Sequence, residues 1–528
     1  MKQIEVPGGT PPQRRRLVSK VLLAVGIGGV LLIGSRTLPV TLMQAGMQGG
    51  GTPGSASEWK MPLAQSWPAE RVWSERLEEE YSEFVARLGQ AVMLRRCRRF
   101  DLCLRDPSAN TLFDSATDPT LALDVDCGDL PYVLRGYFSF KKHLPFAFVC
   151  DVHGVGDHIR YMSDVTPAKS CSWQNYKTPY QVLRGMSDSV HSGMFRMAPS
   201  VEGSDFYSAA VNRRAIRPGT VYYDPNGHVL TVAEVRADGS VFLIDGHPDG
   251  SLTWKRFGAA FALGGHSQGG GFKNFRPQRL VNSQVQRDGN RELPLFDGEA
   301  QWNKSLWAVT GKPGTYYTFV RQSLALGTTP DAETDFREEV RALCRDVSER
   351  VDSVQAAITA GLSARPHPGE LPSNIYGTTG EWEDFATPSR DARLRAAVRE
   401  TYDLVSAIPK DSSQFPRLRI AWREESTKAE CRFSYLNSQS KSVAFTIDDV
   451  LDRLYALSFD PYHCPELRWG TPPNSPELAS CPSDPKKQEW YEKEQRLRNR
   501  IDREYGAPTP LSSGPLVPSS IDFRALLH

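Results

Sequence analysis

Three residues of this sequence could together carry out nucleophilic catalysis by a thiol. Cys127 stands in DVDCGDLPYVLRGYF (124–138), where acids precede it and a helix-like apolar pattern follows. His228 begins the strand-like run HVLTV, and Asp245 ends the next one, VFLID. A histidine can take the proton of a thiol and return it to the leaving group, while a carboxylate orients the imidazole. The pattern predicts a Cys127–His228–Asp245 triad, with His247 as the alternative third member.

The residues around Cys127 indicate how the thiol is placed. Proline fits only the first turn of a helix, so Pro131 makes the helix begin near Gly128 or Asp129. Cys127 then stands just outside the positive end of that helix, where a thiolate forms more readily and backbone N–H groups can hold an oxyanion. Asp126 supports the helix start, but Asp126 and Asp129 oppose ionisation of the thiol, so His228 has to compensate.

The histidine and the third member stand on the clearest β pattern of the chain. Three apolar runs between 219 and 250 are separated by the turn signals DPNG and ADGS. We expect an antiparallel meander with strands at 220–223, 228–235 and 241–245. If ADGS closes the second hairpin, Asp245 lies several residues away from the point that faces His228, so a bulge or a longer loop is needed to bring them together.

Nine cysteines bear on whether Cys127 is free. In an oxidising compartment most pair as disulfides, and an odd count leaves one thiol over. Local spacing suggests three bonds, and elimination then suggests a fourth: Cys97–Cys103, Cys150–Cys171, Cys464–Cys481 and Cys344–Cys431. These pairings leave Cys127 as the free thiol. The alternative is that a different cysteine is left over, buried and inert.

The N-terminus predicts export from the cytoplasm. Basic residues, including Arg14, Arg15 and Arg16, precede the apolar run LVSKVLLAVGIGGVLLIG (17–34). This run is short for a membrane-spanning helix, which needs ~20 residues, and it also suits a secretory signal peptide. No small-residue cleavage site follows it, which favours an uncleaved anchor. Either interpretation places the bulk of the chain outside the cytoplasm, in the periplasm or the extracellular cell envelope.

The length and the composition indicate several domains in 528 residues. The net charge of +1 provides no field for nucleic acid, so none is expected as a partner. Helical spacing appears at 58–94, 335–358, 389–407 and 446–457, whereas 95–123, 150–171 and the glycine-rich 263–277 read as loops. The predicted organisation is a basic tail (1–20), a signal anchor or signal peptide (17–35), a flexible linker (36–57), a helical lead-in (58–112), a catalytic domain (113–277), a linker (278–330) and a mainly helical C-terminal domain (331–528).

The two motifs together resemble a known group of enzymes. DCGDLPYVLRGYF is similar to the Asp-Cys-Ser-Gly helix start of NlpC-type cell-wall endopeptidases, with Asp126 and Cys127 matching Asp-Cys. PGTVYYDPNGHVLTVAEVRADGSVFLID resembles their Pro-Gly strand and Gly-His-Val hairpin, and an Asp at the end of the following strand is found in transglutaminase-like proteins. The resemblance covers roughly 113–275. It implies an α+β, papain-like fold with a central helix and an antiparallel sheet.

The resemblance also implies a function. The expected activity is that of a thiol hydrolase or acyltransferase acting on an amide bond of peptidoglycan or of an envelope protein, with no cofactor. The sequence departs from the group in three places: Gly128 replaces the serine, residues 104–126 contain no tyrosine for the oxyanion site, and 145–215 would be an insertion. Asn110 could substitute for that tyrosine.

Two other interpretations remain open at this point. The departures favour a catalytically inactive envelope scaffold or binding protein with the same fold. Asp151, His153 and His158 could ligate a metal, but their spacing matches no established motif, so no metal is predicted. The sequence predicts no oligomeric state.

Overall fold

The computed structural model describes residues 67–115, 118, 123, 125–156, 159–225, 227–247, 250–258, 261–307, 315–327, 332–372, 375–376, 380–406, 408–498 and 526–527. The predicted basic tail, the apolar segment at 17–34 and the linker that follows lie outside these ranges. Within them, no helix combines the length and the apolar character that a membrane crossing requires.

A six-stranded antiparallel sheet carries the histidine and the third member of the predicted triad. Its strand order is β3-β8-β4-β5-β6-β7. The bounds are β3 (Phe206–Ser208), β4 (Val221–Asp224), β5 (His228–Val235), β6 (Val241–Gly246), β7 (Leu252–Arg256) and β8 (Gly271–Phe275). The three central strands β4, β5 and β6 match the predicted meander closely. Apolar side chains and the DPNG and ADGS turns were sufficient to predict them.

The glycine-rich stretch 263–277, expected to be a loop, contributes β8, the second strand from one edge of this sheet. β8 pairs with β3 on one side and with β4 on the other. The glycines serve the approach to the strand: Gly269 and Gly271 adopt φ of 63° and 85°, which favours glycine. Phe272 and Phe275 then bury the strand. The sequence did not predict β8, because the strand is short, lies next to several glycines, and pairs with strands that are far away in the sequence.

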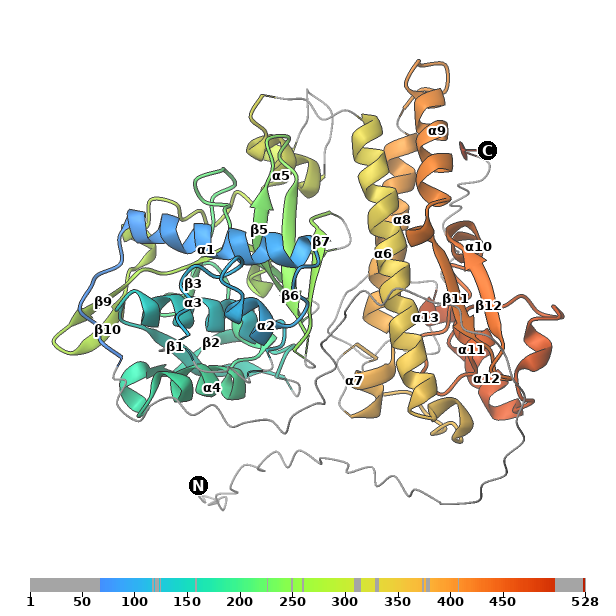
Figure 1. Cartoon of the computed structure of the whole chain (residues 1–528), viewed down its shortest axis with the longest axis horizontal. Helices are drawn as coiled ribbons and strands as arrows, with labels where there is room; N and C mark the ends of the chain where they lie inside the picture. Colours follow the sequence, from blue (N-terminus) through green and yellow to red (C-terminus); the bar gives the residue numbers. More distant parts are fainter. Residues whose placement is uncertain are drawn as a thin grey trace, which may run out of the picture. The chain divides into compact units, whose positions relative to one another are not determined.

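Two helices pack on the sheet and explain the helical spacing near the start of the described chain. α1 (Glu75–Met93) crosses β5, β6 and β7 (Figure 1), and α3 (Asp129–Lys141) begins two residues after Cys127. Residues 67–74, expected to belong to the first helix, are not helical, because Ser74 caps α1 and the helix begins after it. The stretch 95–123 is not only loop, since it contains α2 (Phe100–Arg105).

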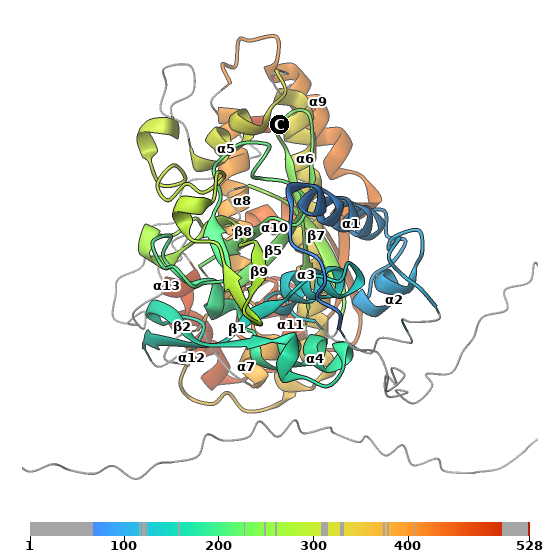
Figure 2. The same cartoon turned by 90° about the vertical axis from the view of Figure 1, so that its left-hand side faces the viewer.

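A hairpin replaces the loop expected after residue 150. β1 (Ala147–Val155) and β2 (Ser163–Ser172) pair antiparallel, and α4 (Pro179–Ser189) packs against α3 and β1 (Figure 2). The sequence did not predict β2 because its burial pattern is mostly exposed, so it lacks the apolar alternation of a half-buried strand. The Cys150–Cys171 disulfide joins the two strands.

Residues 278–330, expected to be a linker, contain regular elements as well. These are β9 (Gln278–Val281), β10 (Gln284–Arg287) and α5 (Tyr316–Leu324). Tyr316, Val320 and Leu324 of α5 lie in the same apolar cluster as Tyr222 and Leu243 of the sheet. This part of the chain therefore packs against the sheet.

The C-terminal region is mainly helical, and its long helix is confirmed. α6 spans Ala332–Thr359, and its apolar stripe forms a separate core with residues of α8, α9 and the hairpin β11–β12. The other elements are α7 (Glu381–Phe385), α8 (Pro388–Ser406), α9 (Phe415–Ser426), β11 (Arg432–Leu436), β12 (Ser442–Thr446), α10 (Ile447–Asp452), α11 (Pro465–Arg468), α12 (Pro485–Lys493) and α13 (Gln495–Arg498). The described chain is thus a mixed α+β protein with antiparallel sheets.

All four proposed disulfides are present, and Cys127 is the free cysteine. The bonds are Cys97–Cys103, Cys150–Cys171, Cys344–Cys431 and Cys464–Cys481. Four disulfides indicate an oxidising compartment, extracellular or periplasmic.

Candidate active site

Cys127 lies at the start of α3, between the sheet and the segment before the 3₁₀ turn at 192–195. The backbone of Val125 and Asp126 packs on Gly246, where an added Cβ would lie 2.9 Å from both carbonyl oxygens. On the other side, an added Cβ at Gly128 would lie 3.0 Å from the backbone nitrogen of Ser192. The missing side chains of these two glycines let the helix start lie directly against the end of β6 on one side and against the backbone of His191 and Ser192 on the other. Cys127 itself is partly exposed.

Asp126 caps the helix that follows the thiol. Its Oδ1 accepts hydrogen bonds from the backbone N–H groups of Gly128 (2.8 Å) and Asp129 (3.0 Å). The expected support of the helix start by Asp126 takes this form. The same bonds occupy two of the N–H groups that a helix start would otherwise offer to an oxyanion. The N–H groups of Gly128 and Asp129 therefore cannot bind an oxyanion, contrary to the expectation that this helix start provides the oxyanion site.

His228 and Asp245 are paired across neighbouring strands. His228 Nε2 lies 3.0 Å from Asp245 Oδ2, and the Asp245 side chain is completely buried. Since an ionised carboxylate only accepts hydrogen bonds, Nε2 carries the hydrogen and donates it. The other ring nitrogen, Nδ1, then holds the lone pair that a base needs. The backbone N–H of Val229, the residue after His228, lies close enough to the Cys127 thiol to lower its pKa.

A β-bulge brings Asp245 towards His228, as the sequence required. The β5–β6 register shifts by one residue between Val232 and Glu234, so that Thr231 faces Ile244. Beyond Thr231 the strands continue towards His228 and Asp245, which lie on the same face as diagonal neighbours. Diagonal pairs are within reach of long side chains such as histidine.

His247 is linked to Asp245 through a hydroxyl. Its Nε2 lies 3.0 Å from Thr253 Oγ1 and 3.8 Å from Asp245 Oδ2. The Thr253 hydroxyl donates to Asp245 Oδ1 and therefore accepts from His247. Asp245 thus holds His228 directly, and His247 acts on Asp245 from the far side. Thr253 was not recognised in the sequence, because a threonine in a strand carries no signal of such a role.

The electrostatics keep the thiol and the imidazole neutral at rest. Burial raises the pKa of the Cys127 thiol well above its ordinary value, and Asp126 and Asp245 raise it further, against the Val229 N–H and Arg160. Burial lowers the pKa of His228, although Asp245 opposes this. Burial would raise the pKa of Asp245, but His247 and His228 hold it far below the usual range. Such a site favours proton transfer to His228 during attack over a preformed thiolate–imidazolium pair.

Asn110 cannot replace the missing oxyanion tyrosine. It is completely buried, and its amide nitrogen donates to Leu104 O (2.8 Å) and to the Tyr137 hydroxyl (3.0 Å). A tyrosine from the hairpin connection lies near the thiol instead: Cys127 and Arg160 both act on the pKa of Tyr161. Burial raises the pKa of Tyr161 to about 12, so its hydroxyl keeps its hydrogen at neutral pH and donates it to Tyr376 O at 2.9 Å. Tyr161 was not recognised as a neighbour of Cys127 because the two residues are far apart in the sequence.

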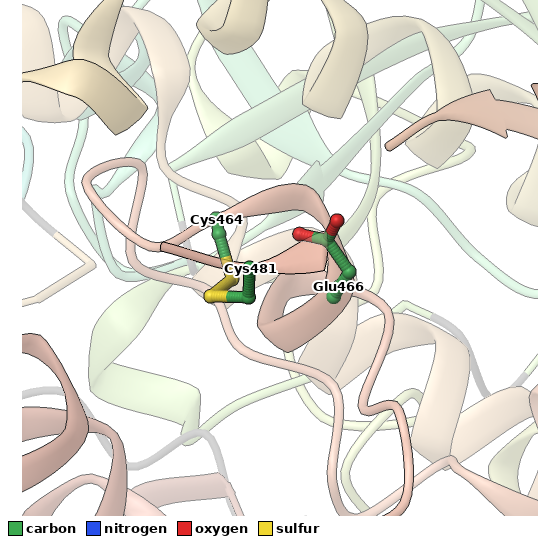
Figure 3. Close-up of side chains that lie close together, drawn as sticks. All are labelled: Cys464, Glu466 and Cys481. Atoms are coloured by element: carbon green, nitrogen blue, oxygen red, sulfur yellow. A yellow bond between two sulfur atoms is a disulfide. The ribbon is translucent and has the colours of Figure 1, made fainter. Parts of the chain in front are cut away.

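The three candidate metal ligands Asp151, His153 and His158 do not form a metal site among the described residues. Asp151 and His153 lie exposed in β1, whereas His158 is outside the described ranges. Two other groups bring ligand-type atoms within 4.8 Å of one another. In the first, Cys464 and Cys481 form a disulfide beside Glu466 and so offer no thiolate (Figure 3).

The second group, His367, Asp460 and Glu494, is a buried hydrogen-bond network. His367 Nε2 lies 2.8 Å from Asp460 Oδ2, and the backbone N–H of Gly369 donates to His367 Nδ1 at 3.0 Å. A neutral imidazole that accepts at Nδ1 carries its hydrogen on Nε2. Nε2 therefore donates to Asp460 and has no lone pair for a metal. This arrangement does not fit a metal centre.

No protein-family model, no curated protein and no solved structure matches the chain.

Proposed function

We propose that this protein is an exported thiol hydrolase or acyltransferase with a papain-like catalytic region, acting on an amide bond of a cell-wall peptide or an envelope protein. The observation that carries the proposal is the His228–Asp245 pair at 3.0 Å, next to Val229, whose backbone N–H acts on the free thiol of Cys127. The choice of an amide and of a cell-wall substrate rests on the resemblance of the two motifs. An anchor in the membrane through 17–34 belongs to the same proposal.

In the proposed reaction, His228 Nδ1 takes the thiol proton as Cys127 Sγ attacks the carbonyl carbon of the amide. Asp245 holds the imidazole through Nε2 and stabilises the imidazolium that forms. The amine leaves with the proton from His228, and a thioester remains on Cys127. Water then releases the acid in a hydrolase, or a second amine takes the acyl group in a transferase. Either step regenerates the thiol.

Alkylation of the thiol tests the triad. The full-length exported protein is treated with iodoacetamide at pH 7.5 without reductant, and the labelled cysteine is mapped by mass spectrometry. We expect selective labelling of Cys127, slowed about tenfold or more in His228→Ala because the base is lost. Asp245→Asn should slow it severalfold, whereas His247→Gln should stay within about twofold because His247 makes no hydrogen bond to the His228 ring.

Three results would count against the triad. These are a Cys127 found in a disulfide, a labelling rate unchanged by His228→Ala, and a larger effect of His247→Gln than of Asp245→Asn. The last result would make His247 the third member. For the substrate, release of soluble products from purified cell wall should require Cys127, and Cys127→Ala is the control.

A binding protein that keeps this fold without catalysis is the second candidate. The raised pKa of Cys127, caused by burial and by Asp126, favours it, since such a thiol is a poor nucleophile at rest. This candidate predicts that Cys127→Ala leaves retention on purified cell wall unchanged and that no products are released.

A further inference from the structure

A short segment, Ile159–Met162, borders the thiol and contacts both segments that flank it. The carbonyl oxygen of Ile159 packs against Gly193, next to the Ser192 backbone that contacts Gly128. The Tyr161 hydroxyl lies 3.1 Å from the position of an added Cβ at Gly227, the residue before His228. The segment therefore spans the surroundings of Cys127 and His228.

Buried hydrogen bonds hold this segment in place. Arg196 Nε donates to Met162 O at 2.8 Å, and its Nη1 donates to Pro225 O at 2.8 Å. One guanidinium thus joins the segment to the turn that leads into β5. Because these carbonyls are not free to move independently, side chains on the segment keep a defined position relative to the thiol.

Arg160 is the charged side chain of this segment, and its field reaches the sulfur. The guanidinium lowers the pKa of Cys127 and of the Tyr161 phenol. Its Nη2 forms an ion pair with Glu383 Oε1 of α7, and the Tyr161 hydroxyl donates to Tyr376 O at 2.9 Å. The Arg160 and Glu383 side chains are 30% and 34% exposed, so solvent and small solutes can reach this ion pair.

We propose that Arg160 binds a carboxylate of the substrate next to the amide that Cys127 attacks, and that Glu383 of the same chain occupies this position when no substrate is bound. The inference rests on the proposed function and names an acidic substrate group for the same site. The planar guanidinium fork matches a carboxylate, and Glu383 shows that a carboxylate fits there. Glu383 is then a competitor that an acidic peptide has to displace.

Two alkylating reagents of different charge test this inference on the thiol itself. Iodoacetate carries a carboxylate and iodoacetamide does not, so the ratio of their rates at Cys127, relative to a cysteine-containing model peptide, reports the anion preference beside the sulfur. Glu383→Gln should raise this ratio about threefold to tenfold, since it removes the carboxylate that competes for Arg160. Arg160→Gln should lower the ratio and abolish the effect of Glu383→Gln, while Arg160→Lys should preserve the preference.

Glu381→Gln is the matched control on the same helix. Glu381 pairs with Arg365 at 2.5 Å and accepts from the Tyr462 hydroxyl at 3.1 Å, so its loss should leave the ratio unchanged. A ratio that is equal in wild type, Glu383→Gln and Arg160→Gln would overturn the inference while leaving the triad intact. A ratio that responds as expected, with a rate indifferent to His228→Ala, would support the anion site and overturn the proposed catalysis. A Cys127 that neither reagent labels in any variant would overturn both.

Discussion

Around Cys127, the individual side chains set an electrostatic balance that is unusual for a helix start. Asp126 precedes Cys127 and Asp129 follows it at the start of α3, and the Asp126 carboxylate caps this helix. Asp129 is buried, and its Oδ2 accepts from the backbone N–H of Asp126 at 3.3 Å. Burial, with the charge of Asp126, raises the pKa of Asp129 to about 8. Asp129 is therefore protonated at neutral pH.

The raised pKa of Asp129 makes a prediction about stability and pH. The folded protein binds a proton at Asp129 that the unfolded chain, with an ordinary pKa of about 4, has released, so stability falls as the pH rises from about 4 to 8. Asp129→Asn removes this cost. We expect the variant to exceed the wild type in free energy of unfolding by at least about 1 kcal/mol at pH 8.

Urea unfolding of both proteins between pH 5 and pH 8 measures this difference. The advantage of Asp129→Asn should shrink steadily as the pH falls towards 5. Parallel pH profiles for the two proteins would show that Asp129 is ionised in the folded state. Ser187 and Asp188 also act on Asp129, but both are unchanged in the comparison.

At the scale of elements, the site depends on how closely α3 approaches β6. Gly246 follows Asp245 and allows the carbonyl oxygens of Val125 and Asp126 to lie against the strand. The bulge in β5 then adjusts the position of His228 relative to Asp245. The contact of α3 with Gly246 thus positions Cys127, and the register shift in β5 positions His228 next to Asp245.

Gly246→Ala should disturb both stability and thiol chemistry. Its Cβ would lie 2.9 Å from two backbone oxygens that cannot rotate away, so α3 has to move from the strand. We expect a loss of about 1–3 kcal/mol in the free energy of unfolding and a slower alkylation of Cys127. Denaturant unfolding and mass spectrometry of the labelled thiol measure the two effects.

Gly265→Ala is the control for this change. Its nearest contact would be Gln268 Oε1 at 3.6 Å, an ordinary distance, and its φ of −78° suits alanine. Equal effects of the two substitutions would mean that the approach of α3 to β6 is not what positions the thiol.

At the scale of the whole molecule, ion pairs and disulfides connect parts of the chain that are remote in sequence. Lys255 of β7 lies 2.7 Å from Glu349 of α6, and Arg256 lies 3.3 Å from Asp335. The Cys344–Cys431 bond joins residues 87 positions apart within the C-terminal core, whereas Cys97 and Cys103 are only six apart. A covalent link restricts the unfolded chain more when the loop it closes is longer.

The two disulfides should therefore differ in their contribution to stability. Replacing both Cys344 and Cys431 by alanine should lower the free energy of unfolding by about 2 kcal/mol more than replacing both Cys97 and Cys103. Guanidinium unfolding of the two double variants, followed by far-UV circular dichroism, measures this. Equal losses would show that strain or residual structure in the unfolded chain outweighs loop closure.

The amino-acid sequence by itself predicted the features that depend on local pattern. Apolar spacing and turn residues predicted α3, α6 and the strands β4, β5 and β6, because a helix or hairpin is specified by its own side chains. Pro131 predicted where α3 begins. The spacing of the cysteines, with elimination for the last pair, predicted all four disulfides and the free thiol at Cys127.

Only the tertiary structure decided which of these residues meet. The hydrogen bond between His228 and Asp245 depends on a one-residue bulge that puts both side chains on one face of the sheet, and no residue type specifies a bulge there. β8 and the Arg160–Glu383 pair depend on contacts between segments far apart in the chain. Such contacts leave no periodic signal, because each is set by the packing of elements whose own patterns are satisfied independently.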